Sequence, residues 1–419
     1  MTLQPGDINL ASNNDLMTID VGVPYEYFAV LRREAPVYWN PPPVDGARIF
    51  ELGDAYEPIG FWVLSKYGDV VMASKDTDRF SAWENSVLWI DTKQSEMALA
   101  AQRAGMMGMD PPDHTQFRRL VQPGFTPRSI NALEPHIRGQ AAKVIGELAE
   151  RGEAEFVFEV ASELPMILLC EMMGIPQERR DEYMALGNAT ASFEFNDNFV
   201  EDQINLFLML DDVVKTVTDA PDDTLISKYV HGEVDGRKLA PDEITQFFQT
   251  LSIAGHETTR NTTAHFVRLM DEHPDQKALL LEDLEGRLPN AIEEVLRVSP
   301  PVMQFCRTAT EDIELRGESI RKGDKVYMSY ISANRDEDIF DDPDTFDILR
   351  PNAGKHLAFG MGAHFCLGAS LARLQLRCVL AELYTQLPDI SLAEAPTPMY
   401  SVWFNALNEM PVRTCPVAH

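Results

Sequence analysis

The sequence predicts a mainly helical protein with a smaller β-rich region, an α+β fold class. In residues 127–217 and 241–273, apolar side chains recur three or four positions apart, which is the period of an amphipathic α-helix. Runs typical of strands, several of them next to glycine turns, gather near both ends of the chain, at 48–52, 60–64, 305–308, 313–316 and 325–329. We expect a β-rich lobe from about 20–70 and 300–410 and a helical lobe from about 75–297 and 366–388.

Composition and charge exclude several classes of protein. At 419 residues and 45% hydrophobic content the chain can bury a large core, and a net charge of −30 argues against nucleic-acid binding, which needs a basic face. Five cysteines without paired spacing indicate reduced thiols. The polar segment 1–20 resembles neither a signal peptide nor a membrane anchor, and the longest apolar run, 164–175, is too short to span a bilayer. We therefore expect a cytoplasmic protein.

Two early features allow more than one interpretation. After a predicted helix at 25–34, residues 80–108 are irregular but rich in aromatic and methionine side chains, so they either pack on the core or line an apolar pocket. His114 and Arg118 lie four positions apart on one face of a helix that follows two prolines. They form either a surface pair or a cationic clamp on an anionic ligand.

The predicted helix at 241–273 would be about 45–50 Å long and could cross a whole domain. Its middle carries the run AGHETT at 254–259, in which Gly255 weakens the helix and the Thr258 hydroxyl can compete for a backbone carbonyl. This run indicates either a local opening of the helix onto a pocket, or a glycine packed against another helix with threonines bonded to their own backbone.

A shorter helix at 290–297 contains Glu294 and Arg297, an i,i+3 pair that is common and weak when exposed. The run FGMGAHFCLG at 359–368 then places Cys366 at the start of a helix that continues to about residue 388. Unpaired N–H groups there favour a thiolate, so Cys366 could be a nucleophile or a metal ligand. Gly360, Gly362 and Gly368 would let the backbone lie against a flat ligand.

Three of these motifs together resemble the cytochrome P450 haem-thiolate monooxygenases. Phe359, Gly362, Cys366 and Gly368 match the F-x-x-G-x-x-x-C-x-G signature, Glu294 to Arg297 match E-x-x-R, and 254–259 match A-G-x-[DE]-T-T. The motifs stand in the family's order, and the similarity extends over nearly the whole chain. The resemblance implies a single catalytic domain over 1–419 that holds haem b between the long central helix and the cysteine loop.

The resemblance also implies roles for individual residues. Cys366 would be the thiolate ligand of the iron, and Glu257 with Thr258 would deliver protons for the activation of dioxygen (O2) in an opened groove of the helix. The haem-binding residues would be His114, Arg118, Ala254, Arg307, Phe359, Gly360, His364, Cys366 and Gly368, with His114, Arg118, Arg307 and His364 facing the propionates. Glu294 and Arg297 would be structural, with Arg335 as the third member of their network and Arg350 as an alternative.

Substrate and electron partners follow by the same analogy. Large apolar side chains would line the pocket and suit a terpenoid, steroid or other lipid-like substrate: Trp83, Val87, Leu88, Phe193, Phe195, Ile253, Ala254, Val302, Met303, Phe305, Trp403 and Phe404. Electrons would come from a ferredoxin and its ferredoxin reductase. A basic patch on the cysteine side would dock the ferredoxin, formed by Arg119, Arg128, Lys355, Arg373 and Arg377. The alternatives are a peroxide-dependent haem-thiolate oxygenase, a haem-thiolate ligand sensor and, if no haem binds, a cysteine hydrolase.

Overall fold

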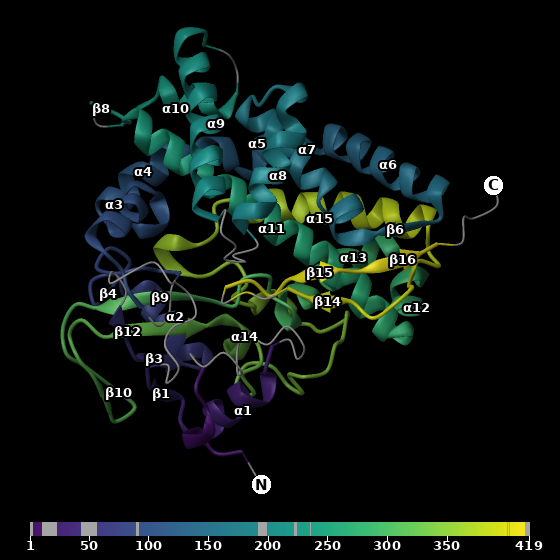
Figure 1. Cartoon of the computed structure of the whole chain (residues 1–419). Helices are drawn as coiled ribbons and strands as arrows, with labels where there is room; N and C mark the ends of the chain where they lie inside the picture. The colour runs from purple at the N-terminus through teal and green to yellow at the C-terminus, as the bar shows by residue number, and fades with distance from the viewer. Residues whose placement is uncertain are drawn as a thin grey trace.

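The computed structural model describes residues 3–10, 23–42, 57–88, 92–191, 199–221, 224–234, 236–399, 401 and 403–414. The predicted strand at 48–52 and the predicted pocket residues Phe193 and Phe195 lie outside these ranges. Figure 1 shows helices occupying one side of the molecule and a twisted sheet the other. The α+β class predicted from the sequence is confirmed.

The helices of nine or more residues are α1 (Tyr25–Glu34), α2 (Tyr67–Lys75), α3 (Glu96–Ala104), α4 (Asp113–Val121), α6 (Glu134–Arg151), α7 (Glu163–Met173), α8 (Arg180–Ala191), α9 (Phe199–Asp219), α11 (Pro241–Glu272), α12 (Pro274–Glu282), α13 (Leu284–Val298) and α15 (Ala369–Gln386). Shorter ones are η1 (Pro5–Asp7), η3 (Met106–Gly108), η4 (Gln122–Phe125), α5 (Pro127–Asn131), the π-helical η5 (Val157–Ala161), η6 (Gln177–Arg179), α10 (Leu225–Val230), α14 (Tyr330–Ala333), η7 (Ala353–Lys355) and η8 (Gly362–His364).

The main sheet has the strand order β1-β3-β12-β9-β4. Its strands are β1 (Val37–Asn40), β3 (Phe61–Leu64), β4 (Phe80–Ser81), β9 (Gln304–Ala309) and β12 (Lys325–Ser329). The pairing of β12 with β3 is parallel and the other pairings are antiparallel, so the sheet joins segments from both ends of the chain. A second sheet has the order β13-β16-β6, from β13 (Ser391–Leu392), β16 (Pro411–Arg413) and β6 (Glu153–Glu155).

The remaining strands form two-stranded pairs. They are β2 (Glu57–Pro58) with β5 (Thr92–Lys93), β7 (Glu233–Val234) with β8 (Arg237–Lys238), β10 (Ile313–Leu315) with β11 (Glu318–Ile320), and β14 (Thr397–Pro398) with β15 (Leu407–Glu409).

Helix α11 is the element that the helical side is built around. Its 32 residues give a length of about 48 Å. Phe247 and Phe248 near its start belong to a core cluster shared with α4, α9 and α10, whereas Phe266 and Met270 near its end belong to the cluster of α6, α13 and α15. A third cluster packs α1 and α2 on the main sheet. Because α11 crosses two of the three clusters, its middle lies deep in the molecule.

Two predicted segments differ from the structure. The stretch 80–108 is not irregular throughout, because α3 forms over Glu96–Ala104, where alanine and other strong helix formers predominate. The helical run 127–217 is interrupted at residues 153–155 by β6, which pairs with β16 from the far end of the chain. Among the described residues, no helix combines the length and apolar content needed to cross a bilayer.

Candidate functional site

The cysteine loop runs from Phe359 to the start of α15. The Cys366 N–H donates to the Phe359 carbonyl at 2.8 Å and closes the loop. Gly360 and Gly362 have φ of 67° and 73°, a region that favours glycine. A Cβ at Gly362 would collide with the Ser74 carbonyl at the end of α2, so this glycine serves close backbone packing rather than the flat ligand that the sequence suggested.

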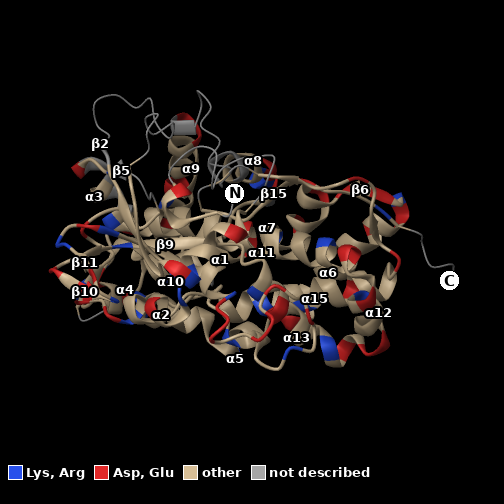
Figure 2. Cartoon of the chain, turned by 90° about the horizontal axis from the view of Figure 1, so that it is seen from below, with Lys and Arg blue, Asp and Glu red and all other residues tan. Residues whose placement is uncertain are grey.

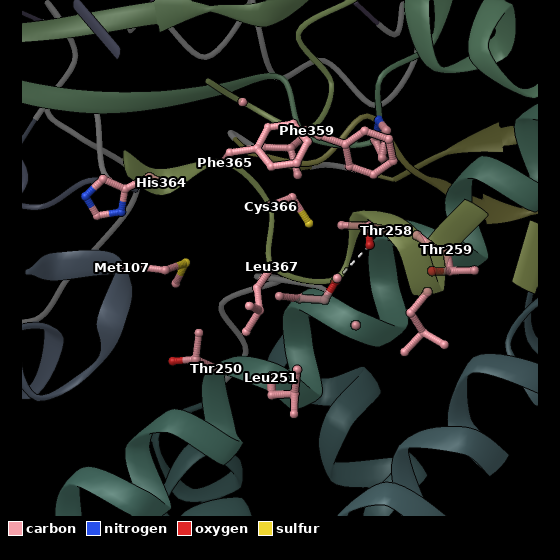
Figure 3. Close-up of a pocket in the computed structure, with 18 of the residues that line it drawn as sticks. Met107, Thr250, Leu251, Thr258, Thr259, Phe359, His364, Phe365, Cys366 and Leu367 are labelled. Atoms are coloured by element: carbon pink, nitrogen blue, oxygen red, sulfur yellow. Dashed lines mark hydrogen bonds between the residues drawn. The ribbon is translucent and has the colours of Figure 1, made fainter. Parts of the chain in front are cut away.

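The Cys366 thiol lies on the wall of a cavity of about 220 Å³ that opens between this loop and α11 (Figure 3). Burial raises the pKa of Cys366, and the Gly368 N–H together with Arg118 and Arg373 only partly offset that effect. Without a metal ion, burial therefore outweighs the groups near the helix start that favour the thiolate. A metal ion removes the proton of a coordinating thiol outright, so the environment suits a ligand better than a free nucleophile.

The opposite wall of the cavity is the middle of α11. Ala254, Gly255 and Thr258 line it, and the Thr258 hydroxyl donates to the Ala254 carbonyl at 2.7 Å. A Cβ at Gly255 would lie 3.1 Å from a methyl group of Leu169 in α7. The helix is continuous here, so the expected local opening is absent: the glycine serves helix packing and the threonine bonds its own backbone.

Glu257 does not line the cavity. Its carboxylate is fully buried in an ion pair with Arg260, one turn on, and accepts a hydrogen bond from Asn261 at 3.3 Å. Burial raises the pKa of Glu257, but Arg260 and His256 outweigh burial and lower it overall. The acid of the predicted acid–alcohol pair is thus held by a cation on the helix side rather than in the cavity beside Thr258.

One end of the cavity gathers cationic and imidazole groups. His114, Arg118, Arg307 and His364 all line it, and the two imidazole rings lie 4.2 Å apart between centroids. Burial, together with Arg118 and Arg307, lowers the pKa of His114 to about 4. Burial and Arg307 likewise lower the pKa of His364 well below its usual value. Both imidazoles are therefore neutral near pH 7.

Arg118 has a second function in this structure. Its guanidinium donates to the carbonyls of Ala363 at 3.2 Å and Phe365 at 2.6 Å, and so braces the cysteine loop. In contrast, the Nε2 atoms of His114 and His364 are buried without a hydrogen-bond partner. Buried polar atoms normally have partners, so this end of the cavity fits an anionic group that would accept from them.

Of the predicted pocket residues, Ala254, Val302, Phe305 and Trp403 line the cavity. The other predicted residues in the described ranges do not line it. Val87, Met303 and Phe404 are buried in the core, and Ile253 and Leu88 pack against the sheet cluster. Trp83 lies at the surface, with the Arg103 guanidinium over one face of its ring. Part of this outcome follows from the extended backbone that leads into β9. Neighbouring side chains point to opposite sides there, so Val302 faces the cavity and Met303 does not.

Several lining residues were not predicted. They are Phe247, Thr250 and Leu251 on α11, Leu168, Leu169 and Met172 on α7, and Tyr330 on α14. Those on α11 could have been found, because they lie one and two turns before Ala254 and share its face of the helix. Tyr330 belongs to none of the sequence motifs, so no signal in the sequence pointed to it. It contacts Gly360 and faces Arg307, and burial raises its pKa to about 12.

The Glu294–Arg297 pair is fully buried and is completed by Arg350, not by the predicted Arg335. Arg350 Nε donates to Glu294 at 3.0 Å, beside the Arg297 hydrogen bonds of 2.8 Å. Arg335 instead stacks on Tyr25 at 3.7 Å and pairs with Asp344. The chain turns between the two arginines and brings Arg350, fifteen positions later in the sequence, back to the buried carboxylate.

Glu293, the residue before this pair, connects α13 to the cysteine loop. It accepts two hydrogen bonds of 2.7 Å from Arg373 of α15, whose guanidinium lies 4.3 Å from the Phe359 ring centroid. His356 donates to the same carboxylate at 3.2 Å, because its other ring nitrogen accepts from the Ala358 N–H. Burial raises the pKa of Glu293, but Arg373 and His356 outweigh it and bring the value to about 2.

The comparisons with known proteins agree on one family. A sequence model described as Cytochrome P450 matches residues 208–386. The chain is 37% identical to a steroid C26-monooxygenase of Rhodococcus jostii, over 98% of this chain and 88% of that protein. It is 36% identical to a methyl-branched lipid omega-hydroxylase of Mycobacterium tuberculosis, over 97% and 94% of the two chains. A Mycobacterium marinum cytochrome P450 in complex with pseudoionone superposes with a TM-score of 0.84 at 36% identity, covering 93% and 94%.

The cavity fits the haem b that members of this family bind. Two carboxylates would meet the unpartnered Nε2 atoms of His114 and His364 beside Arg307. Cys366 presents its sulfur from the loop side, and a Cβ at Gly368 would meet no protein atom within 4 Å. The thiol, the glycine and the cationic end therefore face one cavity, as a thiolate-bound porphyrin with two propionates requires.

Proposed function

The chain belongs to the cytochrome P450 family, and from this premise we propose that the protein, a haem b monooxygenase, hydroxylates an elongated and largely apolar substrate of the steroid, terpenoid or branched-lipid class. The relatives named above act, by their names, on a steroid and on methyl-branched lipids, and a related enzyme is known in complex with testosterone. These likenesses support the substrate class.

The observation that carries the proposal is the chemistry of the cavity wall. Side chains of α7, α11 and the approach to β9 present hydrocarbon and aromatic groups, and among the described lining residues the only charged ones, Arg118 and Arg307, lie at the cationic end. An apolar wall with few fixed polar groups is typical of a site for a hydrophobic small molecule. A charged substrate would lose its hydration without a counter-charge.

Haem b held through a thiolate supplies the activation of dioxygen, because the thiolate donates electron density that favours O–O cleavage. We assign the remaining tasks to this chain's residues. Cys366 would hold the iron, while His114, Arg307 and His364 would hold the propionates. Thr258 presents a hydroxyl that can give and receive a proton at the α11 wall. Glu257 can relay a proton to it once its carboxylate has left Arg260, taken up a proton from water and turned toward Thr258.

We further propose that a ferredoxin delivers the electrons at the face of the cysteine loop. Arg119 in α4, Arg128 in α5 and Lys355 in η7 are exposed and make no ion pair within the described residues. Arg373 and Arg377 are paired with Glu293 and Glu134, so they carry less free charge than expected from the sequence. The docking patch is accordingly assigned to the three unpaired side chains.

A ligand screen tests the proposed substrate class. Steroids, acyclic terpenoids, methyl-branched fatty acids and straight-chain fatty acids are titrated against the ferric holoprotein, and the change in haem spin state is followed by absorption. We expect saturable shifts with members of the first three groups, followed by hydroxylated products when a ferredoxin and its reductase are added. Shifts only with small charged molecules would contradict the proposal.

A further inference from the structure

Most of the hydroxyl groups along α11 are bonded to their own helix. Thr245, Ser252, Thr258, Thr262 and Thr263 each donate to the carbonyl four residues earlier, at 2.7 to 3.0 Å. Such bonds satisfy the hydroxyl and remove it from ligand recognition. A threonine on this helix that makes no such bond keeps its hydroxyl available to a ligand.

Thr250 is such a residue and it lines the cavity. Its hydroxyl has no hydrogen bond within the described structure, and it is accessible rather than sealed in the core. The oxygen lies 3.4 Å from the position that a Cβ at Gly105 would occupy, so it faces the segment of η3 next to α11. Figure 3 shows the Thr250 hydroxyl directed toward the side of the cavity on which Met107 lies.

Apart from the Gln102 carbonyl and the Gln246 side chain, which lie near the same point beside Gly105, the surroundings of Thr250 are apolar. Its neighbours on the cavity wall are Met106 and Met107 of η3 and Phe247 and Leu251 of α11. Thr259, the other α11 hydroxyl on the wall that makes no side-chain hydrogen bond within the described residues, directly follows Thr258 and so belongs to the haem end. Thr250 lies eight residues before Thr258, which places it about 12 Å away along the helix axis.

We propose that Thr250 is a specificity-determining residue that selects substrates carrying a hydroxyl or keto oxygen remote from the carbon that is oxidised. The hydroxyl can donate to a ketone or accept from an alcohol, while the methionine and aromatic side chains around it receive only hydrocarbon. A single fixed polar group in an apolar pocket orients the ligand, because a polar atom left unpaired there is costly. This inference rests on the proposed function. It narrows the substrate class from apolar molecules in general to apolar molecules that carry one hydroxyl or keto oxygen.

A pair of ligands with one skeleton tests it. Androstanone and androstane, which differ in one keto oxygen, are titrated against the ferric holoprotein of the wild type and of Thr250→Val, which keeps the side-chain shape and removes the hydroxyl. We expect the wild type to prefer the ketone, and the valine variant to bind the ketone about tenfold more weakly with unchanged affinity for the hydrocarbon. Thr250→Ser restores the hydroxyl and should restore the preference.

The matched control is Thr245→Val, which removes a hydroxyl of the same helix that is bonded to Pro241 and does not line the cavity. It should leave both affinities unchanged. If Thr250→Val keeps the ketone preference, or weakens both ligands equally, Thr250 is only a packing residue and the inference is wrong while the substrate class stands. If the wild type responds to neither ligand nor to any lipid in the screen, the proposed substrate class is wrong and the inference is wrong with it.

Discussion

The Cys366 sulfur lies in the cavity wall, where burial opposes ionisation while an N–H group and two arginines favour it. Burial raises its pKa, and the Gly368 N–H and two arginines reduce that rise without cancelling it. A nucleophilic thiol needs a base or a stronger local positive potential. A metal-bound thiol needs neither, so this environment suits a metal ligand better than a free nucleophile.

Thr258 is the hydroxyl that the proposed proton transfer depends on. Thr258→Ala removes it without disturbing the cysteine loop, so we expect haem to be retained and product per electron pair consumed to fall by roughly tenfold or more, with hydrogen peroxide formed instead. Thr263→Val, which removes a buried hydroxyl outside the cavity, is the control. Unchanged coupling in Thr258→Ala would refute the role in proton delivery.

Arg307 is the buried cation best placed to hold a propionate. Burial lowers the pKa of this guanidinium, which is usually charged at all pH values, and an anion beside it would relieve the cost of its burial. We expect Arg307→Leu to transfer haem to apomyoglobin roughly tenfold or more faster than the wild type, since charged hydrogen bonds contribute about 1.5–3 kcal/mol. The control is Arg321→Leu, at an exposed turn, which should transfer haem at the wild-type rate. Equal transfer rates would show that Arg307 does not hold haem.

At the scale of elements, the network of Glu293, Arg373 and His356 joins α13, α15 and the cysteine loop. Because the folded-state pKa of Glu293 is about 2, below its unfolded value near 4.3, its contribution to stability is complete above that unfolded value and is lost as pH falls toward 2. The Arg373 guanidinium of this network packs on the ring of Phe359, so the network also fixes the geometry of the cysteine loop.

Glu293→Gln should therefore lower the free energy of unfolding by roughly 2 kcal/mol at neutral pH and flatten its loss between about pH 5 and pH 2. Urea unfolding of the holoprotein at several pH values, followed by far-UV circular dichroism, measures both effects. The control is Glu282→Gln, whose side chain is 66% exposed in its ion pair with Arg287. If Glu293→Gln and the wild type lose stability in parallel as pH falls, the network is not a stabilising one.

The sequence predicted elements better than contacts. Periodicity located α11 to within a residue at its end, and the strand signals found β3, β9, β10 and β12. It could not show that Arg350 rather than Arg335 reaches Glu294, because that depends on how the loop from 334 to 350 turns back. Nor could it show that Gly362 is required by Ser74, which lies almost 290 positions away in the chain.

The whole molecule carries a net charge of −30, which would repel an acidic electron donor. Figure 2 shows acidic segments scattered along the ribbon, with basic segments interspersed, several of them around α13 and α15. On the proposed ferredoxin pathway, an acidic donor would need a local group of cations to attract it. The composition alone could predict this need, but only the folded chain separates paired from unpaired arginines.

Arg119→Glu tests the proposed docking patch, because Arg119 is exposed and unpaired within the described residues. We expect reduction by a ferredoxin to slow by roughly tenfold at low ionic strength and to become less sensitive to salt. Lys215→Glu on α9, outside the patch, is the control for total charge. If both variants slow equally, the net charge and not the patch governs the encounter.

The most direct measurement on the central claim is the absorption spectrum of the reduced protein under carbon monoxide. A haem held by the Cys366 thiolate predicts the red-shifted Soret band of a haem-thiolate, retained in Cys378→Ala, whose cysteine is buried away from the cavity, and lost in Cys366→His. A wild-type band at the position of a histidine-ligated haem, or the red-shifted band persisting in Cys366→His, would contradict the account.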